Sequence, residues 1–157
     1  MQGQLFFNPA EHHAAFMRDL AAGVCTTCPT CRRHAQIYRR TFHASMARQL
    51  IQLYRLGGAV GYVHASALII PGISGAGDFS KAKYWGLIAT KINTDSHTKA
   101  NGMWTLTPDG MAFVNGHLNI PREVHIFDDQ IHGVSAQEIS IQDALGKRFN
   151  YHELMGG

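Results

Sequence analysis

Two neighbouring stretches decide the fold: GDFSKAKYWGLI, residues 77–88, and GMWTLTPDG, residues 102–110. The first predicts a helix that ends at Gly86, because glycine commonly follows the last helical residue. LIATKI and MWTLT are β-prone runs separated by NTDSHTKANG, a polar loop rich in turn formers. They predict a hairpin with a long tip. Thr107, followed by proline, then opens another short helix.

The chain before these stretches predicts two more helices. From about Ser45 to Leu56, apolar residues recur on one helical face and polar residues on the other, and a glycine pair then ends the helix. GYVH is a strand fragment or turn, and ASALII is a short helix that stops at Pro71. Residues 45–115 therefore predict the order helix, strand fragment, helix, turn, helix, hairpin, helix.

This order, with GLI followed by W-T-L-T-P-x-G, resembles the winged helix-turn-helix domain. The resemblance covers about half of the chain and implies an α+β fold with a winged helix-turn-helix at residues 44–120. It also implies a helix that enters the major groove of duplex DNA and a wing that contacts the backbone. The implied DNA contacts are Ser80, Lys81 and Lys83 on the helix and Lys91 and Lys99 on the wing. Phe79, Ala82, Tyr84 and Trp85 would mainly seat the helix on the core.

Two flanking segments are expected to pack with this core as one unit. Residues 1–43 carry a helix that begins at Asn8-Pro9, followed by a cysteine-rich segment resembling a zinc knuckle. Residues 121–157 carry EVHIF and QIHGV around Asp128-Asp129, a two-residue hairpin turn. Two overlapping helix-cap signatures come next, Ser135 to Glu138 and Ser140 to Asp143.

All three cysteines, Cys25, Cys28 and Cys31, lie in CTTCPTCRRH, with His34 one step further on. An odd number of cysteines in a short cluster is more typical of metal binding or redox chemistry than of disulfides. Cys28 and Cys31 form a half-site for structural zinc, which takes four ligands. Because four ligands within ten residues are crowded, these two would join Cys25 or His34 and a histidine from elsewhere.

Alternatives to zinc are a metal-free cysteine cluster, an iron–sulfur fragment and a redox pair. An iron–sulfur cluster would lack a fourth cysteine, and a redox CPTC would need a helix beginning at Cys28. With a turn at residues 128–129, His125 would face His132 across the hairpin. This pair either completes a metal site or is an ordinary cross-strand pair.

Arg32, Arg33, Arg39 and Arg40 form the densest positive run in the chain. They are candidate phosphate contacts or ordinary surface charge. Arg39 and Arg40 lie in the strand-like run QIYRR, so they would point to opposite faces and cannot join one patch. Both are kept as candidate DNA contacts.

Composition sets broader limits. The 157 residues are 45% apolar and 16% charged, with a formal net charge of +3, which indicates a globular protein that tolerates an anionic partner. No apolar run has the length of a membrane span and no signal peptide is evident, so a cytoplasmic protein of a bacterial host or its phage is expected. No phosphate loop, nucleophile elbow or HExxH motif occurs, which indicates a non-catalytic protein. A nuclease built on His125, His132 and an aspartate is the alternative left open.

The combination of CPxC, the YRR strand and the helix-and-wing order also resembles small phage and prophage proteins. We therefore expect a zinc-stabilised DNA-binding protein that acts as a regulator or accessory factor of a phage or mobile element. The alternative is a protein-binding module or inhibitor that acts on a host protein complex. The segment from Pro121 onward has enough apolar residues to mediate homodimerisation.

Overall fold

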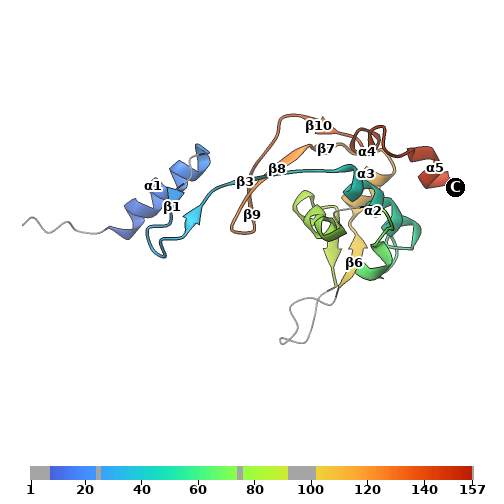
Figure 1. Cartoon of the computed structure of the whole chain (residues 1–157), viewed down its shortest axis with the longest axis horizontal. Coiled ribbons are helices and arrows are strands. Elements are labelled where there is room, and N and C mark those ends of the chain that lie inside the picture. The colour runs from blue at the N-terminus through green and yellow to red at the C-terminus, as the bar shows by residue number, and fades with distance from the viewer. Residues whose placement is uncertain (1–7, 24–25, 74–75, 92–101, 157) are drawn as a thin grey trace, which may run out of the picture. The chain divides into compact units, whose positions relative to one another are not determined.

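The computed structural model describes residues 8–23, 26–73, 76–91 and 102–156 (Figure 1). The chain is α+β, with several helices and small antiparallel sheets, as predicted. The helices are α1 (Pro9–Ala21), α2 (Ala44–Arg55), α3 (Pro108–Val114), α4 (Ile141–Leu145) and α5 (Tyr151–Gly156), with 3₁₀ helices η1 (Ala65–Leu68) and η2 (Ala76–Trp85). The strands are β1 (Thr26–Thr27), β2 (His34–Ala35), β3 (Tyr38–Thr41), β4 (Val63–His64), β5 (Ile88–Thr90), β6 (Met103–Leu106), β7 (Ile120–Pro121), β8 (Glu123–Phe127), β9 (Gln130–Val134) and β10 (Glu138–Ile139).

The chain folds as two compact units that differ from the expected three segments. Unit 1 comprises residues 1–40 and 125–133, and unit 2 comprises residues 41–124 and 134–157. The predicted C-terminal segment therefore contributes to both units, because the tip of the β8–β9 hairpin belongs to unit 1. No helix in the described part of the chain is both long and apolar enough to cross a bilayer.

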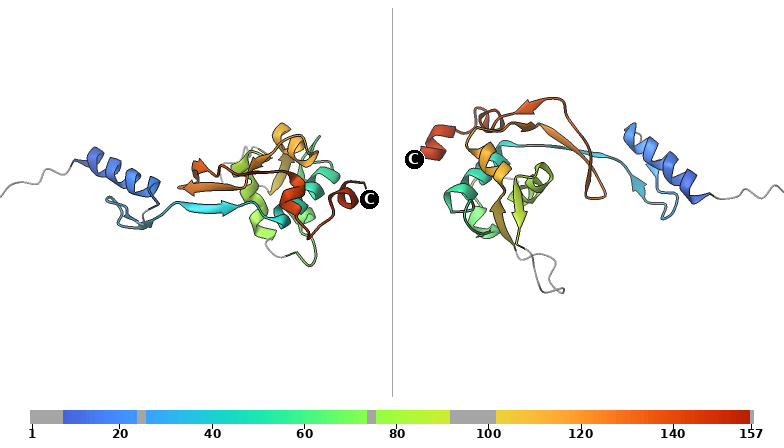
Figure 2. Two further views of the ribbon diagram at one scale, coloured as in Figure 1. Left: turned by 90° about the horizontal axis from the view of Figure 1, so that it is seen from above. Right: turned by 180° about the vertical axis from the view of Figure 1, so that it is seen from behind.

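Unit 2 is built around helix α2. This helix contacts η1, η2, α3, α4, α5 and β6, and Figure 2 shows these elements from two further sides. Its inward face is buried along its whole length, through Met46, Ala47, Leu50, Ile51 and Leu53. The Phe42 ring lies edge-on to Trp85 and Phe113, with centroids 5.2 and 5.5 Å away. These rings and the buried face of α2 belong to one apolar core cluster.

A three-stranded antiparallel sheet of order β4-β6-β5 lies beside this core. Trp104 of the central strand pairs with Val63 on one side and with Thr90 on the other. The strand pattern alternates, so Trp104 and Leu106 are buried while their neighbours are partly exposed. The predicted hairpin is confirmed over its described residues; its loop at residues 92–101 lies outside them.

Unit 1 has a smaller apolar core. Phe16, Leu20 and Ala35 are buried together, with partly buried neighbours that include Cys28 and Phe127. The Phe16 and Phe127 rings lie edge-on, 5.8 Å apart between centroids, so α1 packs against β8. Strands β1 and β2 form a two-stranded hairpin, and β3, β8 and β9 form a sheet in that order.

Most predicted local signals are confirmed. The Asn8 side chain accepts a hydrogen bond from the Ala10 N–H at 3.1 Å, at the predicted start of α1. Asp128 and Asp129 both have left-handed backbone angles, with φ of 51° and 60°, which fits a two-residue hairpin turn. The Ser140–Asp143 capping box is present at α4.

The other predicted cap, at Ser135, is wrong. Its hydroxyl instead accepts a hydrogen bond from the Glu123 N–H and donates one to the Gln137 carbonyl, each at 3.0 Å. Strand β10 follows where a helix was expected. The Ser135 hydroxyl therefore binds the backbone of Glu123, twelve residues away, and does not cap a helix.

Gly110 of α3 lies very close to the backbone of Leu87, which lies between η2 and β5. A Cβ atom at this position would lie 2.0 Å from the backbone oxygen of Leu87. The Thr107 N–H donates to that same carbonyl at 3.1 Å, and the Thr107 hydroxyl accepts from the Gly110 N–H at 3.0 Å. These contacts fix the end of η2 and the start of β5 in one place.

Candidate functional site

Helix η2 seats on the core through one row of side chains. In a 3₁₀ helix, residues three apart nearly eclipse one another, so Phe79, Ala82 and Trp85 share one row. Phe79 and Ala82 are buried, and the Trp85 indole N–H donates to the Pro121 carbonyl at 2.7 Å. The predicted seating on the core is confirmed for Phe79, Ala82 and Trp85, although the helix is 3₁₀ in type. Tyr84, the fourth residue predicted to seat the helix, is only half-buried and lies in the row of Lys81 instead.

A second row of η2 carries Ser80 and Lys83. Ser80 is partly exposed and Lys83 is exposed. The Lys83 Nζ lies 5.1 Å from the centroid of the neighbouring Tyr84 ring, within the range of a cation–π interaction. The ring limits the freedom of this ammonium group while leaving it at the surface.

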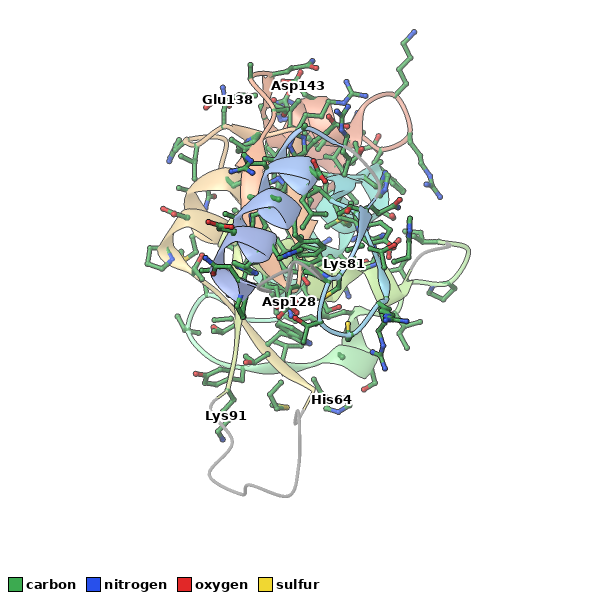
Figure 3. All side chains as sticks on the ribbon, turned by 90° about the vertical axis from the view of Figure 1, so that its left-hand side faces the viewer. His64, Lys81, Lys91, Asp128, Glu138 and Asp143 are labelled. Atoms are coloured by element: carbon green, nitrogen blue, oxygen red, sulfur yellow. The ribbon has the colours of Figure 1, made fainter. Side chains whose placement is uncertain are left out.

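The third row holds an ion pair. The Lys81 Nζ lies 2.7 Å from Asp78 Oδ1, and the two side chains are 33% and 41% exposed. Figure 3 labels Lys81. The Asp78 carboxylate offsets the positive charge of Lys81, which is a predicted DNA contact. Lys81 and Lys83 therefore differ in the net charge that they present to a ligand. The i, i+3 spacing of Asp78 and Lys81 is the sequence signal for this pairing.

Lys91 lies at the end of the β4-β6-β5 sheet. Its N–H donates to the Met103 carbonyl at 3.2 Å, and its Nζ lies 5.9 Å from the centroid of the Tyr62 ring. His64 pairs with Met103 in register, and Figure 3 shows His64 and Lys91 at the same end of this sheet. Among the described residues, this end exposes the Tyr62 and His64 rings and the Lys91 ammonium group. Lys99, the other predicted wing contact, lies outside the described residues.

The two candidate arginines of β3 belong to unit 1 and point in different directions. The Arg40 guanidinium carbon lies 5.8 Å from the centroid of the Tyr38 ring, on one face of the strand. Arg39 lies on the other face, where it lines a cavity with Ile37. The prediction that Arg39 and Arg40 cannot form one patch is confirmed.

The cysteine turn closes the β1–β2 hairpin. The Cys28 N–H donates to the Arg33 carbonyl at 2.9 Å, and the Arg32 N–H donates to the Cys28 carbonyl at 2.8 Å. Arg32 adopts a left-handed backbone with φ of 59°, which is uncommon for a residue other than glycine. The backbone thus turns sharply just after Cys31.

This turn favours a thiolate at Cys28. Hydrogen bonds from the backbone of Cys31 and of Thr30, and then from the Cys31 side chain, lower the pKa of the Cys28 thiol below its ordinary value. Thiolate is the form that binds metal ions. Cys28 is partly exposed and Cys31 is exposed, and neither forms a disulfide.

Among the described residues, the other metal candidates do not join Cys28 and Cys31 at this turn. Cys25 lies outside the described residues, and His34 is exposed and pairs with Thr27 in the hairpin. Within the described ranges, no group of three or more histidine, cysteine, aspartate and glutamate side chains is placed to hold a metal ion. The His132 ring lies near that of Phe127, with centroids 5.9 Å apart.

Comparison with known proteins adds no relative. No protein family matches this chain, and no curated protein or solved structure matches it either. Function must therefore be inferred from the residues themselves.

Proposed function

We propose that this chain is a non-catalytic protein that binds duplex DNA through a winged helix-turn-helix at residues 44–120. The observation that carries the proposal is the direct connection of η2 to the β5–β6 hairpin, whose second strand is central in its sheet. This is the helix-then-wing order. The Gly110 contact with Leu87 ties helix, turn and hairpin to α3 in one body.

Helix η2 is the element that would enter the major groove. Its inward row is fixed to the core, which leaves the row of Ser80 and Lys83 toward solvent. Hydroxyl and ammonium groups contact phosphates and base edges in such interfaces. Lys81 contributes less, because Asp78 offsets its charge.

The β5–β6 hairpin would follow the DNA backbone. Lys91 is exposed at the hairpin end and lies over the Tyr62 ring. A lysine in this position supplies a phosphate contact, which adds affinity without sequence preference. Lys99 would add a second.

A structural zinc ion at the cysteine turn belongs to the same proposal. Cys28 and Cys31 lie on one turn whose N–H groups favour a thiolate, which suits two of the four zinc ligands. Cys25 or His34 is the candidate for the third ligand, and a histidine from elsewhere in the chain is the candidate for the fourth. The small apolar cluster of Phe16, Leu20 and Ala35 supports a need for such a staple in unit 1.

The biological role proposed is that of a regulator or accessory factor of a phage or mobile element, on the resemblance of the CPxC and YRR segments. The competing function is a protein-binding module or inhibitor of a host complex. Exposed apolar side chains in the segment after α2 favour that rival: Val60 is 94% exposed, and Leu56 and Tyr62 are nearly half exposed.

The test is fluorescence anisotropy with a mixed-sequence duplex at low and moderate salt. Binding should weaken as salt rises, and Lys83→Ala should reduce the slope of log K against log salt by about 1. The matched control is Lys147→Ala, which removes the same charge from an exposed residue between α4 and α5. A folded protein without salt-sensitive binding, or equal losses in both variants, would favour the protein-binding rival.

Metal content is measured on the same untagged preparation by mass spectrometry. About one zinc ion per chain is expected. Cys28→Ser combined with Cys31→Ser should remove the ion and lower the melting temperature. An unchanged melting curve in the double variant would count against a structural ion.

A further inference from the structure

Unit 1 contains a cavity of about 430 Å³ that the proposed duplex and zinc sites do not explain. Its walls come from the end of α1, from the residues around the start of β3 and from β8. They comprise Leu20, Ala21, Ala22, Gly23, Ile37, Arg39 and His125. This volume lies within the range of sites that hold a small organic molecule.

Two cationic or potentially cationic side chains line this cavity. Arg39 lies beside Ile37 because residues two apart share one face of a strand, while Arg40 on the opposite face lies over Tyr38. His125 enters from β8. It lies close to Gly133, where a Cβ atom would be 3.2 Å from the His125 Nδ1.

Neither side chain has a partner within the described residues. Arg39 and His125 form no hydrogen bond or ion pair there, and no aspartate or glutamate lines the cavity. A guanidinium group offers a planar fork of N–H donors that matches a phosphate or carboxylate, and a neutral or protonated imidazole adds another donor. The lining therefore offers donors for an anionic group.

The other residues that line the cavity indicate what the anionic group is attached to. Leu20 and Ile37 supply an apolar wall, which suits the carbon skeleton of a ligand. Helix α1 ends at Ala21, where the Arg18 and Leu20 carbonyls accept hydrogen bonds from the Ala22 and Gly23 N–H groups, each at 3.0 Å. The end of the helix is therefore closed by its own backbone, and the ligand is selected by the apolar wall and the two side-chain donors. An anionic group carried on a small carbon skeleton suits both.

We infer that this cavity binds the phosphate of a phosphate ester, with Arg39 and His125 on the phosphate oxygens and Leu20 and Ile37 against the carbon skeleton of the ester. The phosphate is either that of a free phosphate ester or a backbone phosphate of nucleic acid. The site uses residues of unit 1 alone. It is therefore independent of duplex binding by η2 and the hairpin.

The experiment is a ¹H–¹⁵N NMR titration of the full-length protein with ribose 5-phosphate, and separately with a short DNA duplex. Shifts should concentrate at residues 20–23, Arg39 and His125 in at least one arm. Arg39→Gln should weaken that binding about 10-fold or more, as expected for loss of a charge-assisted bidentate contact. Arg39→Lys should retain part of it.

For the ribose 5-phosphate arm, Arg40→Gln is the matched control, because it removes the same charge from the opposite face of the same strand. It should change the affinity for ribose 5-phosphate less than twofold. Binding of ribose 5-phosphate identifies a free phosphate ester as the source. Shifts with duplex alone, lost in Arg39→Gln and retained in Lys83→Ala, identify the nucleic-acid backbone.

The inference is overturned by three results. These are no shift at the cavity residues in either arm, equal losses in the Arg39→Gln and Arg40→Gln variants, or unchanged binding in a folded Arg39→Gln variant. If Lys83→Ala abolishes duplex binding, binding of ribose 5-phosphate at the cavity can still be measured. The proposed duplex binding by residues 44–120 and the proposed phosphate site are therefore tested separately.

Discussion

Asp78→Asn should strengthen duplex binding, because it removes the carboxylate that holds Lys81. The two charged atoms are 2.7 Å apart and both side chains are at least one-third exposed. Exposed pairs of this kind contribute about 0.2–1 kcal/mol to stability, so the variant should remain folded. It gains a released ammonium group and loses a negative charge on the proposed groove-facing helix.

The size of the effect follows from counterion release. Each added phosphate contact steepens the dependence of log K on log salt by about 0.9. Between ~50 and ~200 mM salt, a fourfold change, one additional contact therefore makes the loss of affinity about 3.5-fold larger. The Asp78→Asn variant should bind the duplex more tightly than wild type at low salt. Its affinity should then fall about 3.5-fold more than that of wild type between ~50 and ~200 mM salt.

Fluorescence anisotropy at several salt concentrations measures both quantities. Glu138→Gln is the control, since it changes the net charge equally at an exposed residue of β10, which Figure 3 labels. Its salt slope should stay near that of the wild type. If both variants steepen the slope equally, the gain comes from the overall charge, and the proposed contact by Lys81 is refuted.

Three further predictions concern stability and are read by urea denaturation. Gly110→Ala should destabilise the protein by about 1–3 kcal/mol or more, because its Cβ would meet the Leu87 backbone oxygen; a change below about 0.5 kcal/mol contradicts this packing. Burial raises the pKa of Tyr151, whose hydroxyl donates to the Val114 carbonyl at 2.7 Å. Its contribution is complete below the unfolded-state pKa of about 10 and is lost as pH rises beyond it, so the advantage over Tyr151→Phe should shrink between pH 8 and pH 11. Ser140→Ala should cost about 1 kcal/mol through loss of the α4 cap, and an unchanged midpoint would contradict that role.

Local signals in the sequence were sufficient where the partner lies nearby in the chain. The caps at Asn8 and Ser140 and the turn at Asp128-Asp129 depend on residues within four positions. Ser135 has the same type of signal and fails. Its hydroxyl is taken by the Glu123 N–H, twelve residues away, and no local pattern reports this contact.

The candidate site divides in the same way. The Asp78–Lys81 ion pair was predictable from the sequence, because oppositely charged residues three apart lie next to each other on a helix. The meeting of Arg39 with His125 was not, because only the strand order β3-β8-β9 brings these distant segments into one unit. The left-handed backbone of Arg32 after the cysteine knuckle was also not predictable, because this conformation usually favours glycine.

The mild net charge of +3 is compatible with nucleic-acid binding because of how the cations are held. Lys83 lies over Tyr84 and Lys91 lies over Tyr62, so both ammonium groups have less freedom to lose when they meet a phosphate. Few but preorganised contacts predict a shallow salt slope. With two contacts, or three if Lys99 joins them, the slope of log K against log salt should be about −1.8 to −2.7. A much steeper slope would require cations beyond these lysines, and Arg39 or Arg40 of unit 1 would be the next to replace.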